Sequence, residues 1–379
     1  MTHSPALSVR PISREEHLAA IAARPSVSAL QTPAWGQVKK DWRAESIGWF
    51  DHDALVGVGL VLYRQAPKIR RYLAYLPEGP AIDWESAAKA GDLARWIDPL
   101  VSHVKSQGAF GLRLGPLVVT RIWENATLKA ALADEGVTRL RDVPADETTE
   151  TGRSIARQLE AAGWRPPPES EGFAAGQPQH VFQLPLHGRS PDDVLRGFNQ
   201  LWRRNIKKAD KAGVSVTHGT AADLPAFHAL YAETAERDGF TPRPLGYFEG
   251  MWEAMTAEAP ERIRLYLAHH EDHLVAATTM LRVGVHAWYS YGASSTSKRE
   301  VRGSNAVQWQ MIKDAIADGC EIYDLRGITD TLDESDPHAG LIRFKLGTGG
   351  HAVEYLGEWD LPISRILYGA FDLYLKRRS

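Results

Sequence analysis

One order of secondary structure is predicted twice along the chain of 379 residues, and this repeat limits the possible folds more than any single motif does. Each copy has a strand, two helices, three strands, a helix and a last strand. The elements of the first copy are expected at residues 7–10, 13–23, 32–40, 44–49, 55–63, 71–76, 84–107 and 110–114. Those of the second copy are expected at 214–216, 222–237, 245–255, 263–268, 274–283, 285–291, 304–318 and 321–325. The two copies share this order of elements but not their residues.

Three consecutive strands joined by short turns form an antiparallel meander, and a helix that leads to one further strand adds that strand in parallel. The predicted fold class is therefore α/β (α+β), with two tandem acetyltransferase-like (GNAT-like) domains built on mixed sheets. Between the copies, residues 136–180 are rich in polar residues and contain Pro166-Pro167-Pro168. We therefore expect a linker there, with room for a short helix at 154–162.

The composition excludes some functions. A hydrophobic fraction of 44% and a charged fraction of 24% fit a globular protein with a core. The net charge of -3 means that a nucleic-acid partner would need a local basic patch. Cys320 is the one cysteine of the chain, which excludes an intrachain disulfide and a cysteine-based metal site.

The first residues, Met1 to Ala6, lack the basic start and the apolar core of a signal peptide. No stretch approaches the roughly 20 apolar residues that a membrane-spanning helix needs. We therefore expect a cytoplasmic protein. The segment from Ile363 to Arg378 is apolar and aromatic with a basic end, and two interpretations are open. It could contact the inner face of the membrane, or form a core helix with a solvated end, which is the interpretation that the pattern favours.

A helix is expected from Pro191 to Ala212, with Ser190 as its N-cap and Gly213 after its end. Its apolar positions, which should face the core, are Leu195, Phe198 and Trp202. Its cations are Arg203, Arg204, Lys207, Lys208 and Lys211. Because arginine can bind a phosphate through two parallel hydrogen bonds, these cations indicate an anion site. A solvated charged face explains the same pattern, and from the pattern alone that explanation is favoured.

The segment Phe344-Lys345-Leu346-Gly347-Thr348-Gly349-Gly350 places a lysine beside three glycines. Glycine lets a backbone come close to a ligand and move, so this segment is a candidate site of chemistry. The alternative is a helix cap followed by a turn into a strand at 352–356, and the residues favour neither explanation.

Two other features point weakly to ligands. Gly303 precedes a predicted helix, where acetyltransferases have a glycine-rich loop that binds the pyrophosphate of coenzyme A, but this chain has one glycine there. His269, His270 and His273 crowd one predicted hairpin. A turn rich in His, Glu and Asp is usually solvated, so we predict no metal site.

Seven segments in order along the chain resemble the Fem family of peptidoglycan bridge-forming transferases. They are Leu30-Gln31-Thr32-Pro33-Ala34-Trp35-Gly36 with Lys39, Pro77-Glu78-Gly79-Pro80, Arg203-Arg204-Asn205-Ile206-Lys207-Lys208-Ala209, Trp288 to Ser294, Tyr323-Asp324-Leu325-Arg326-Gly327, Phe344-Lys345, and Gly357-Glu358-Trp359-Asp360. Each segment is loose, but the ordered set is specific and covers most of the chain.

The resemblance implies two acetyltransferase-like domains that do not use acetyl-CoA, one of residues 1–176 with 352–379 and one of residues 177–351. It implies an aminoacyltransferase of peptidoglycan and cell-wall synthesis. The amino acid, usually glycine, alanine or serine, would move from aminoacyl-tRNA to the amine of the third stem-peptide residue, in lipid II or UDP-MurNAc-pentapeptide. Aminoacyl-tRNA would be the co-substrate and no cofactor would be needed. No heptad run matches the coiled-coil arm of some members, so a compact FemX-like form is expected.

Residue by residue, the resemblance places Lys39 and Arg204, or its neighbour Arg203, at the diphosphate of the precursor. It places Lys345 at the reacting centre. The residues implied to line the substrate cleft are Tyr291, Phe344 and Trp35.

One departure concerns the catalytic base. Many relatives carry an acid-proline pair where this chain has Gly115-Pro116, so a carboxylate is missing at that position. In the expected reaction the enzyme aligns an ester and an amine, and Lys345 neutralises the oxyanion or the leaving 3′ end. Two other functions stay open. An acyl-CoA-dependent N-acyltransferase would have Gly303-Ser304 as its support, and a module that only binds anionic sugar nucleotides would show no turnover.

Overall fold

The computed structural model describes residues 6–134, 136–167, 176–333, 336 and 339–376. The chain divides into two compact units. Unit 1 holds residues 1–122, 147–179 and 353–379, and unit 2 holds residues 123–146 and 180–352. This division differs from the sequence-based one mainly at residues 123–146, which belong to unit 2 and not to the first domain. Within the described residues, no helix is both long and apolar enough to cross a bilayer.

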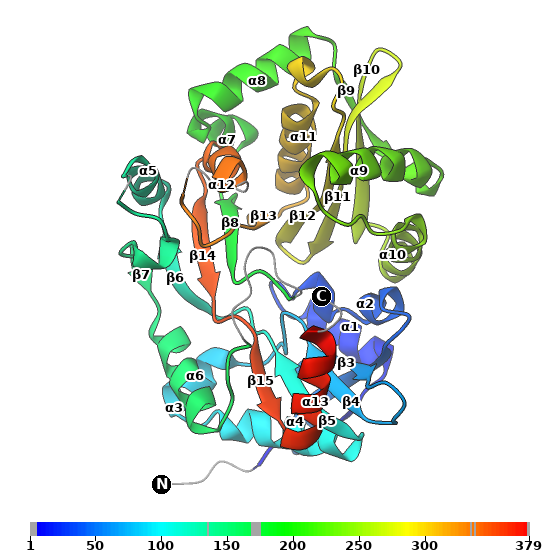
Figure 1. The fold of residues 1–379 in the computed structure, drawn as a ribbon, viewed down its shortest axis with the longest axis vertical. Helices are drawn as coiled ribbons and strands as arrows, with labels where there is room; N and C mark the ends of the chain where they lie inside the picture. The colour runs from blue at the N-terminus through cyan, green and yellow to red at the C-terminus, as the bar shows by residue number, and fades with distance from the viewer. Residues whose placement is uncertain (1–5, 135, 168–175, 334–335, 337–338, 377–379) are drawn as a thin grey trace. The chain divides into compact units, whose positions relative to one another are not determined.

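Unit 1 contains a six-stranded sheet in the order β1-β2-β3-β4-β5-β15 (Figure 1). Its elements are β1 (Ser8–Pro11), α1 (Arg14–Ala22), α2 (Pro33–Val38), β2 (Arg43–Asp51), β3 (Ala54–Gln65), β4 (Tyr72–Leu76), α3 (Trp84–Ala90), α4 (Ala94–Ser106), β5 (Ala109–Leu114), β7 (Glu147–Thr148), α6 (Glu150–Ala161), β15 (Trp359–Pro362) and α13 (Arg365–Lys376). Strands β2, β3 and β4 pair antiparallel, and β5 joins β4 in parallel. The predicted meander with a parallel fourth strand is therefore confirmed.

Two helices of unit 1 show how local sequence sets element ends. The Ser13 side chain accepts a hydrogen bond from the backbone N–H of Glu16, whose side chain in turn accepts from the backbone N–H of Ser13, so the predicted capping box starts α1. The single helix predicted at 84–107 is wrong. Gly91, at φ +64°, ends α3 in the left-handed region, and α4 starts at Ala94.

Unit 2 contains six neighbouring strands of a nine-stranded sheet, in the order β8-β13-β12-β11-β10-β9. Its elements are α5 (Asn125–Ala133), β8 (His180–Pro185), α7 (Pro191–Gly197), α8 (Gln200–Lys211), β9 (Ser215–Gly219), α9 (Leu224–Asp238), α10 (Leu245–Glu258), β10 (Ile263–His270), β11 (His273–Val283), β12 (His286–Ser294), α11 (Gly303–Ala317), β13 (Ile322–Gly327) and α12 (Ala339–Leu346). Strands β10, β11 and β12 pair antiparallel, and β13 joins β12 in parallel, again as predicted. The chain passes between the units within β6 (Val119–Trp123) and β14 (His351–Tyr355).

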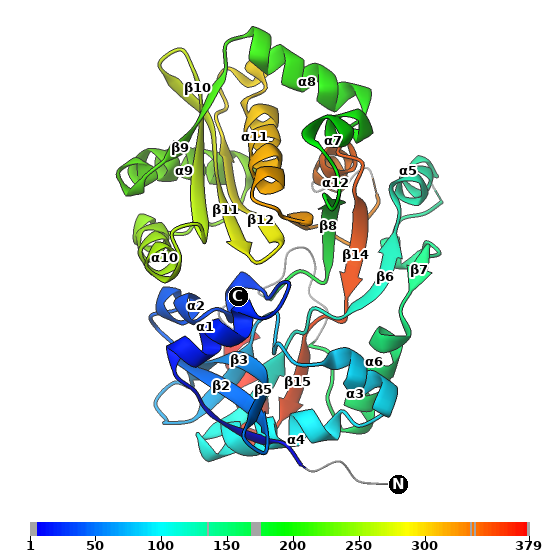
Figure 2. The ribbon, with the colours of Figure 1, turned by 180° about the vertical axis from the view of Figure 1, so that it is seen from behind.

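Helices cover both faces of the unit 2 sheet: α9 lies on one face and α11 on the other (Figures 1 and 2). Gly303, the first residue of α11, lets this helix pack closely, because a Cβ built there would lie 2.7 Å from a methyl carbon of Val275 on β11. The core on the α11 side includes Phe198 and Trp202, which the sequence placed there correctly.

The single helix predicted from Pro191 to Ala212 is also wrong, since it is two helices. Helix α7 ends at Gly197, and Phe198 takes an extended conformation. The Asn199 side chain then accepts a hydrogen bond from the backbone N–H of Trp202 at 2.8 Å and caps α8. The cations predicted on that single helix all lie on α8.

Residues 136–180, predicted as a linker with room for a short helix at 154–162, do contain a helix, which begins earlier, at Glu150. Helix α6 is amphipathic, buries Ile155 and Leu159, and packs against α3. Polar residues face solvent on its other side, which made the stretch look like a linker. Residues 168–175 of this prediction lie outside the described residues. The predicted class, two tandem acetyltransferase-like domains with mixed sheets, is confirmed by the two sheets and by the structural comparisons reported below.

Candidate active site

Lys345, the residue that the resemblance implied at the reacting centre, is buried near the end of α12, with 3% of its surface exposed. Its Nζ donates a hydrogen bond to the carbonyl oxygen of Gly327 at 2.5 Å and to that of Arg326 at 3.2 Å. Both carbonyls belong to β13. The lysine therefore points from the last turn of the helix into the end of a strand of the unit 2 sheet.

The surroundings of Lys345 change its ionisation. Burial lowers the pKa of Lys345 most strongly, because the charged ammonium loses water, and the positive charge of Arg326 lowers it further. The negative charge of Asp324 acts in the opposite direction. The result is a pKa of about 7, so the ammonium and the neutral amine are both populated near neutral pH.

Asp324 lies at the centre of a buried polar group beside Lys345, with 1% of its surface exposed. Its carboxylate accepts hydrogen bonds from the Gln183 side chain at 3.1 Å and from the backbone N–H of Arg326 at 2.5 Å, and His286 Nε2 is 3.5 Å away. Burial alone would raise the pKa of Asp324, but the neighbouring His286 side chain and the charge of Arg326 outweigh it, so the pKa lies below its usual value. From the sequence, Asp324 could be considered as a possible base, because it is a carboxylate inside the apolar run of β13, whereas Gln183 and His286 had no assigned role.

The glycines after Lys345 serve packing and chain direction. A Cβ on Gly347 would overlap the ring of Trp202, and the Gly347 carbonyl accepts from the backbone N–H of Asn199 at 2.8 Å. Gly349 is at φ +79° beside the Gly197 carbonyl. These close contacts indicate that the segment is a helix cap followed by a turn into β14 and not a mobile loop. A side chain at either glycine would collide with α7 or α8.

Helix α8 is joined to the lysine segment by aromatic contacts. Trp202 Nε1 donates to the Phe344 carbonyl at 2.8 Å, and the two rings have centroids 4.7 Å apart. The candidate cations Arg203 and Arg204 follow directly on this helix and are exposed. Arg203 donates to the Arg196 carbonyl at 2.9 Å, whereas Arg204 has no ion-pair partner among the described residues. Arg204 is therefore the more available of the two for an anion.

The unit 1 candidates, Lys39 and Trp35, lie at α2. Lys39 caps the end of this helix, and its Nζ lies 5.1 Å from the centroid of the Trp35 ring, as in a cation–π contact. Trp35 is 6% exposed, so its ring is part of the core and supports Lys39.

Tyr291, the remaining candidate, belongs to an aromatic cluster between β12, α9 and α10. Its hydroxyl lies 2.9 Å from that of Tyr247, and its ring packs against Tyr231 and Phe248. Burial raises the pKa of Tyr247, so the Tyr247 hydroxyl stays protonated at neutral pH.

A carboxylate does lie beside Gly115 in unit 1, but it belongs to Glu358, in the segment between β14 and β15. The Glu358 Cγ is 3.1 Å from the position of a Cβ on Gly115. Glu358 accepts from the Tyr75 hydroxyl at 2.5 Å and pairs with Arg113 at 3.4 Å. Burial raises the pKa of Glu358 above its usual value. Sequence comparison at Gly115 alone could not find this carboxylate, because it lies far away in the chain.

Three other features do not add to the site. The close packing of α11 explains why residue 303 is a glycine, so a phosphate-binding role is not needed to explain it.

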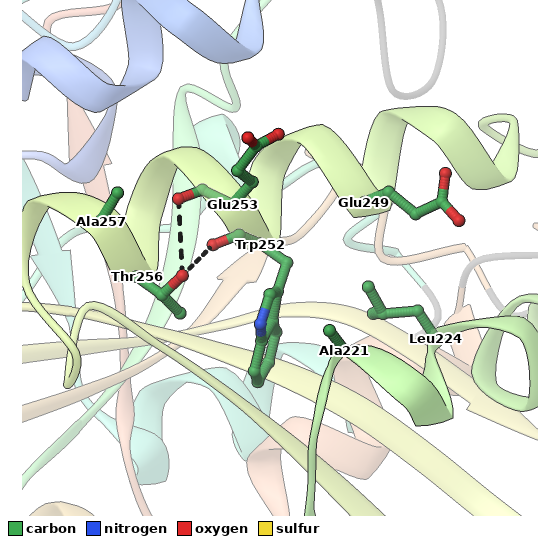
Figure 3. A pocket seen from close by; sticks show the side chains of 7 residues that line it. All are labelled: Ala221, Leu224, Glu249, Trp252, Glu253, Thr256 and Ala257. Carbon is green, nitrogen blue, oxygen red and sulfur yellow. Dashed lines mark hydrogen bonds between the residues drawn. The ribbon is translucent and has the colours of Figure 1, made fainter.

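In the histidine-rich hairpin, Lys298 Nζ lies 3.3 Å from His270 Nδ1, 3.2 Å from His273 Nδ1 and 2.5 Å from Glu271. A cationic side chain therefore occupies the place between them. Figure 3 shows a surface hollow beside Trp252 of α10, which contains none of the predicted site residues.

The two units define a tandem acetyltransferase-like protein that carries a basic helix and a buried lysine in its second unit. A family model described as the FemAB family matches residues 12–269 and 253–376. The chain therefore belongs to the FemAB family, and it is a transferase. Both statements confirm predictions made from the sequence.

The relatives of the chain match it along its length. The lipid II:glycine glycyltransferase of Staphylococcus aureus (strain MRSA252) is 23% identical over 425 residues, which cover 94% of this chain and 93% of that protein. The crystal structure of FemX superimposes with a TM-score of 0.78 at 21% identity and covers 96% of this chain and 99% of that one. A tandem GNAT protein from the clavulanic acid biosynthesis pathway has a TM-score of 0.50 at 11% identity, with 94% and 99% covered.

The close contact at Gly347 predicts a loss of stability for Gly347→Ala. The added methyl group collides with Trp202, and overpacking of this kind typically costs about 1–3 kcal/mol. Thermal melting should show a lower midpoint. The control is Gly340→Ala on α12, where no atom lies within 4 Å of the new Cβ and the midpoint should stay or rise. Equal midpoints for the two variants would contradict this packing.

The burial of Lys345 predicts that its side chain titrates near pH 7, far below the value of about 10.4 for a free lysine. The measurement is a pH titration of the Cε resonance in protein labelled with ¹³C-lysine. The resonance of Lys345 is identified as the one missing from Lys345→Met. A midpoint above pH 9 would show that the ammonium is solvated and not buried.

Proposed function

We propose that the chain transfers an amino acid from aminoacyl-tRNA to the third-residue amine of the peptidoglycan stem peptide and so builds the interpeptide bridge. The acceptor is lipid II or UDP-MurNAc-pentapeptide, and the cargo is glycine, alanine or serine. The observation that carries the proposal is the buried Lys345, with a pKa of about 7, in a chain that matches a lipid II:glycine glycyltransferase almost end to end.

The proposed reaction requires a group that can both bind and release a proton. The acceptor nitrogen forms a bond to the aminoacyl carbonyl carbon, and the bond from that carbon to the 3′ oxygen of the tRNA breaks. The amine loses one proton and the 3′ oxygen gains one. A group with a pKa near the working pH is best suited to donate to the developing oxyanion and to the leaving oxygen.

Lys345 has one hydrogen-bond donor left for that task. An ammonium has three N–H groups, and the carbonyls of Arg326 and Gly327 accept two of them. Among the described residues the third has no acceptor, so it is available for a substrate oxygen. Because the first two bonds hold Nζ in place, little reorganisation is needed when charge develops.

The precursor's diphosphate needs cations, and Lys39 in unit 1 and Arg204 in unit 2 are the proposed ones. Arg204 is exposed and has no hydrogen-bond or ion-pair partner in the described part of the chain, and a guanidinium can bind a phosphate through two parallel bonds. Trp35 beneath Lys39 limits the freedom of that side chain. Tyr291 and Phe344 are the proposed apolar contacts of the substrates.

The runner-up, an acyl-CoA-dependent N-acyltransferase, has lost its support in the sequence, because the packing of α11 on β11 accounts for Gly303. A protein that only binds anionic sugar nucleotides would not need a buried lysine that titrates near pH 7.

The test of the proposed function is a transfer assay with a pool of charged tRNAs. Lipid II analogues and UDP-linked precursors are offered with either lysine or diaminopimelate in the stem, and their mass is followed. A gain equal to one amino acid residue supports the proposal and identifies the cargo. No gain with any precursor, together with binding of coenzyme A, would favour the N-acyltransferase.

Replacing Lys345 should separate chemistry from binding. We expect Lys345→Met to lower the turnover number by about 10²–10³-fold, the usual effect of losing one donor to an oxyanion, while the Kd for the precursor stays the same. Lys313→Met, which removes a lysine from α11 of the same unit, is the control and should keep wild-type turnover. Near-normal turnover of Lys345→Met would exclude this role.

Replacing the proposed diphosphate partners should have the opposite effect. Lys39→Ala and Arg204→Ala should each weaken precursor binding about tenfold, equal to about 1.4 kcal/mol, with little change in turnover at saturation. Binding is measured by calorimetry with UDP-MurNAc-pentapeptide. The neighbouring exposed cations provide controls, Lys40→Ala and Lys208→Ala. A larger loss from Arg203→Ala than from Arg204→Ala would assign the role to Arg203.

The proposed contact with the inner face of the membrane would use α13. This helix packs Phe371 against Phe110 of unit 1, while Ile366 is 85% exposed and Leu373 is 51% exposed. Ile366 and Leu373 are seven positions apart and so lie on one face of the helix. The predicted basic end lies outside the residues whose side chains are described, so the membrane contact stays a prediction.

A further inference from the structure

Strand β13 leaves its regular pairing with β8 directly after Asp324. Asp324 pairs with Gln183 and Gly327 pairs with Val181, so two residues of β13 stand opposite one residue of β8. One of the two, Arg326, has φ +64°, a left-handed conformation that residues with a side chain seldom adopt. This is a β-bulge, which turns backbone groups away from the ladder.

The Asp324 side chain holds this bulge. One carboxylate oxygen accepts the backbone N–H of Arg326 at 2.5 Å, two residues further along the chain. Such a bond from an aspartate to the backbone two residues on stabilises turns and left-handed residues. The other oxygen accepts from the Gln183 side chain at 3.1 Å and lies 3.5 Å from His286 Nε2. The carboxylate is thus fixed from β8 and β12.

The carbonyls that the bulge turns are those that hold Lys345. They belong to Arg326 and Gly327, and they accept both observed hydrogen bonds of the Lys345 ammonium. A chain of contacts therefore runs from the Asp324 carboxylate through the left-handed Arg326 to Lys345 Nζ. In regular pairing, successive carbonyls of β13 would instead alternate between its two neighbours, β8 and β12.

We propose that Asp324 is the positioning residue of Lys345: its carboxylate maintains the β13 bulge whose two carbonyls receive the lysine, and it supplies the negative charge that the buried ammonium needs. This inference rests on the role proposed above for Lys345 and extends it to a residue that does not touch the substrate.

The charges around Lys345 agree with this assignment. Asp324 raises the pKa of Lys345, whereas burial and the Arg326 guanidinium lower it. Both charged side chains come from β13. His286 of β12 faces Asp324, and Gln183 of β8 is neutral. On α12 itself, Arg343 is exposed, two residues before Lys345. Asp324 is thus the group whose charge favours the ammonium form.

The first experiment compares Asp324→Asn with the wild-type protein. Asparagine keeps an oxygen that can accept the Arg326 N–H but loses the charge. We expect the midpoint of the Lys345 ¹³C titration to fall by about one pH unit or more, the usual effect of removing a neighbouring opposite charge. Turnover at pH 7 should fall about fivefold or more, because a midpoint one unit lower reduces the ammonium fraction from about one half to about one tenth. The Kd for UDP-MurNAc-pentapeptide should stay unchanged.

Asp360→Asn is the matched control. Asp360 is a buried carboxylate that pairs with Arg113 in unit 1, so its replacement also removes a buried ion-pair partner. The Lys345 midpoint should not move in this variant. Equal midpoints in Asp324→Asn and the wild type, or an equal shift in Asp360→Asn, would overturn the proposal. The titration reports on Lys345 without turnover, so its outcome is independent of whether the proposed reaction is correct.

The second experiment tests the backbone part with Asp324→Ala, which loses both the charge and the acceptor. In an Arg326→Gly background, glycine adopts the left-handed conformation without help, and the guanidinium that opposes the ammonium is also absent. We expect Asp324→Ala to lower turnover several times less in this background than in the wild type. An Arg326→Ala background removes the same guanidinium without this freedom and should give no such relief. Equal losses in the glycine and alanine backgrounds would show that Asp324 does not act through the bulge.

Discussion

A lysine ammonium inside a protein must find hydrogen-bond acceptors, because burying it without them costs several kcal/mol. In unit 2 the acceptors are the carbonyls of Arg326 and Gly327, and this pair of bonds ties the last turn of α12 to the end of β13. The bulge in β13, the left-handed Arg326 and the carboxylate of Asp324 are all needed to present those carbonyls. The bulge in β13 is thus explained by the hydrogen bonds that its carbonyls accept from Lys345.

The segment after Lys345 is held from the opposite side by α8. Trp202 contacts the ring and the carbonyl of Phe344, and the Asn199 backbone binds Gly347. Asn199 also caps α8, so one short stretch starts the basic helix and fixes the lysine segment. The cations of α8 and the ammonium of Lys345 are therefore connected through packed residues of unit 2, as the alignment role proposed for this site would require.

Much of the fold could be predicted from the sequence, because each unit follows an alternation of apolar strands and amphipathic helices that admits few topologies. Helix interruptions were harder. Gly91 and Asn199 end or begin helices inside periodic runs, where the apolar pattern continues across the break and hides it.

The site was predicted unevenly for a related reason. Lys345 and the α8 cations stood out as residues, but the role of the glycines depended on Trp202, which lies far away in the chain. The contributions of Asp324 and Glu358 depend on a strand bulge and on a contact with Gly115, and neither leaves a periodic trace in the sequence. Residue types indicated which side chains could bind or react with a substrate. Contacts between segments far apart in the chain determined which of those side chains lie in the candidate site.

Unit 1 is assembled from three separate stretches of chain, and this has a consequence for synthesis on the ribosome. Strand β5 pairs on one side with β4, its neighbour in the chain, and on the other with β15, which includes Asp360, 247 positions after its partner Arg113. The whole of unit 2 is translated between them. While unit 2 emerges, β5 is an open sheet edge, which is the kind of edge that recruits foreign strands. The nascent chain thus carries its greatest risk of mispairing in the unit that begins first and is completed last.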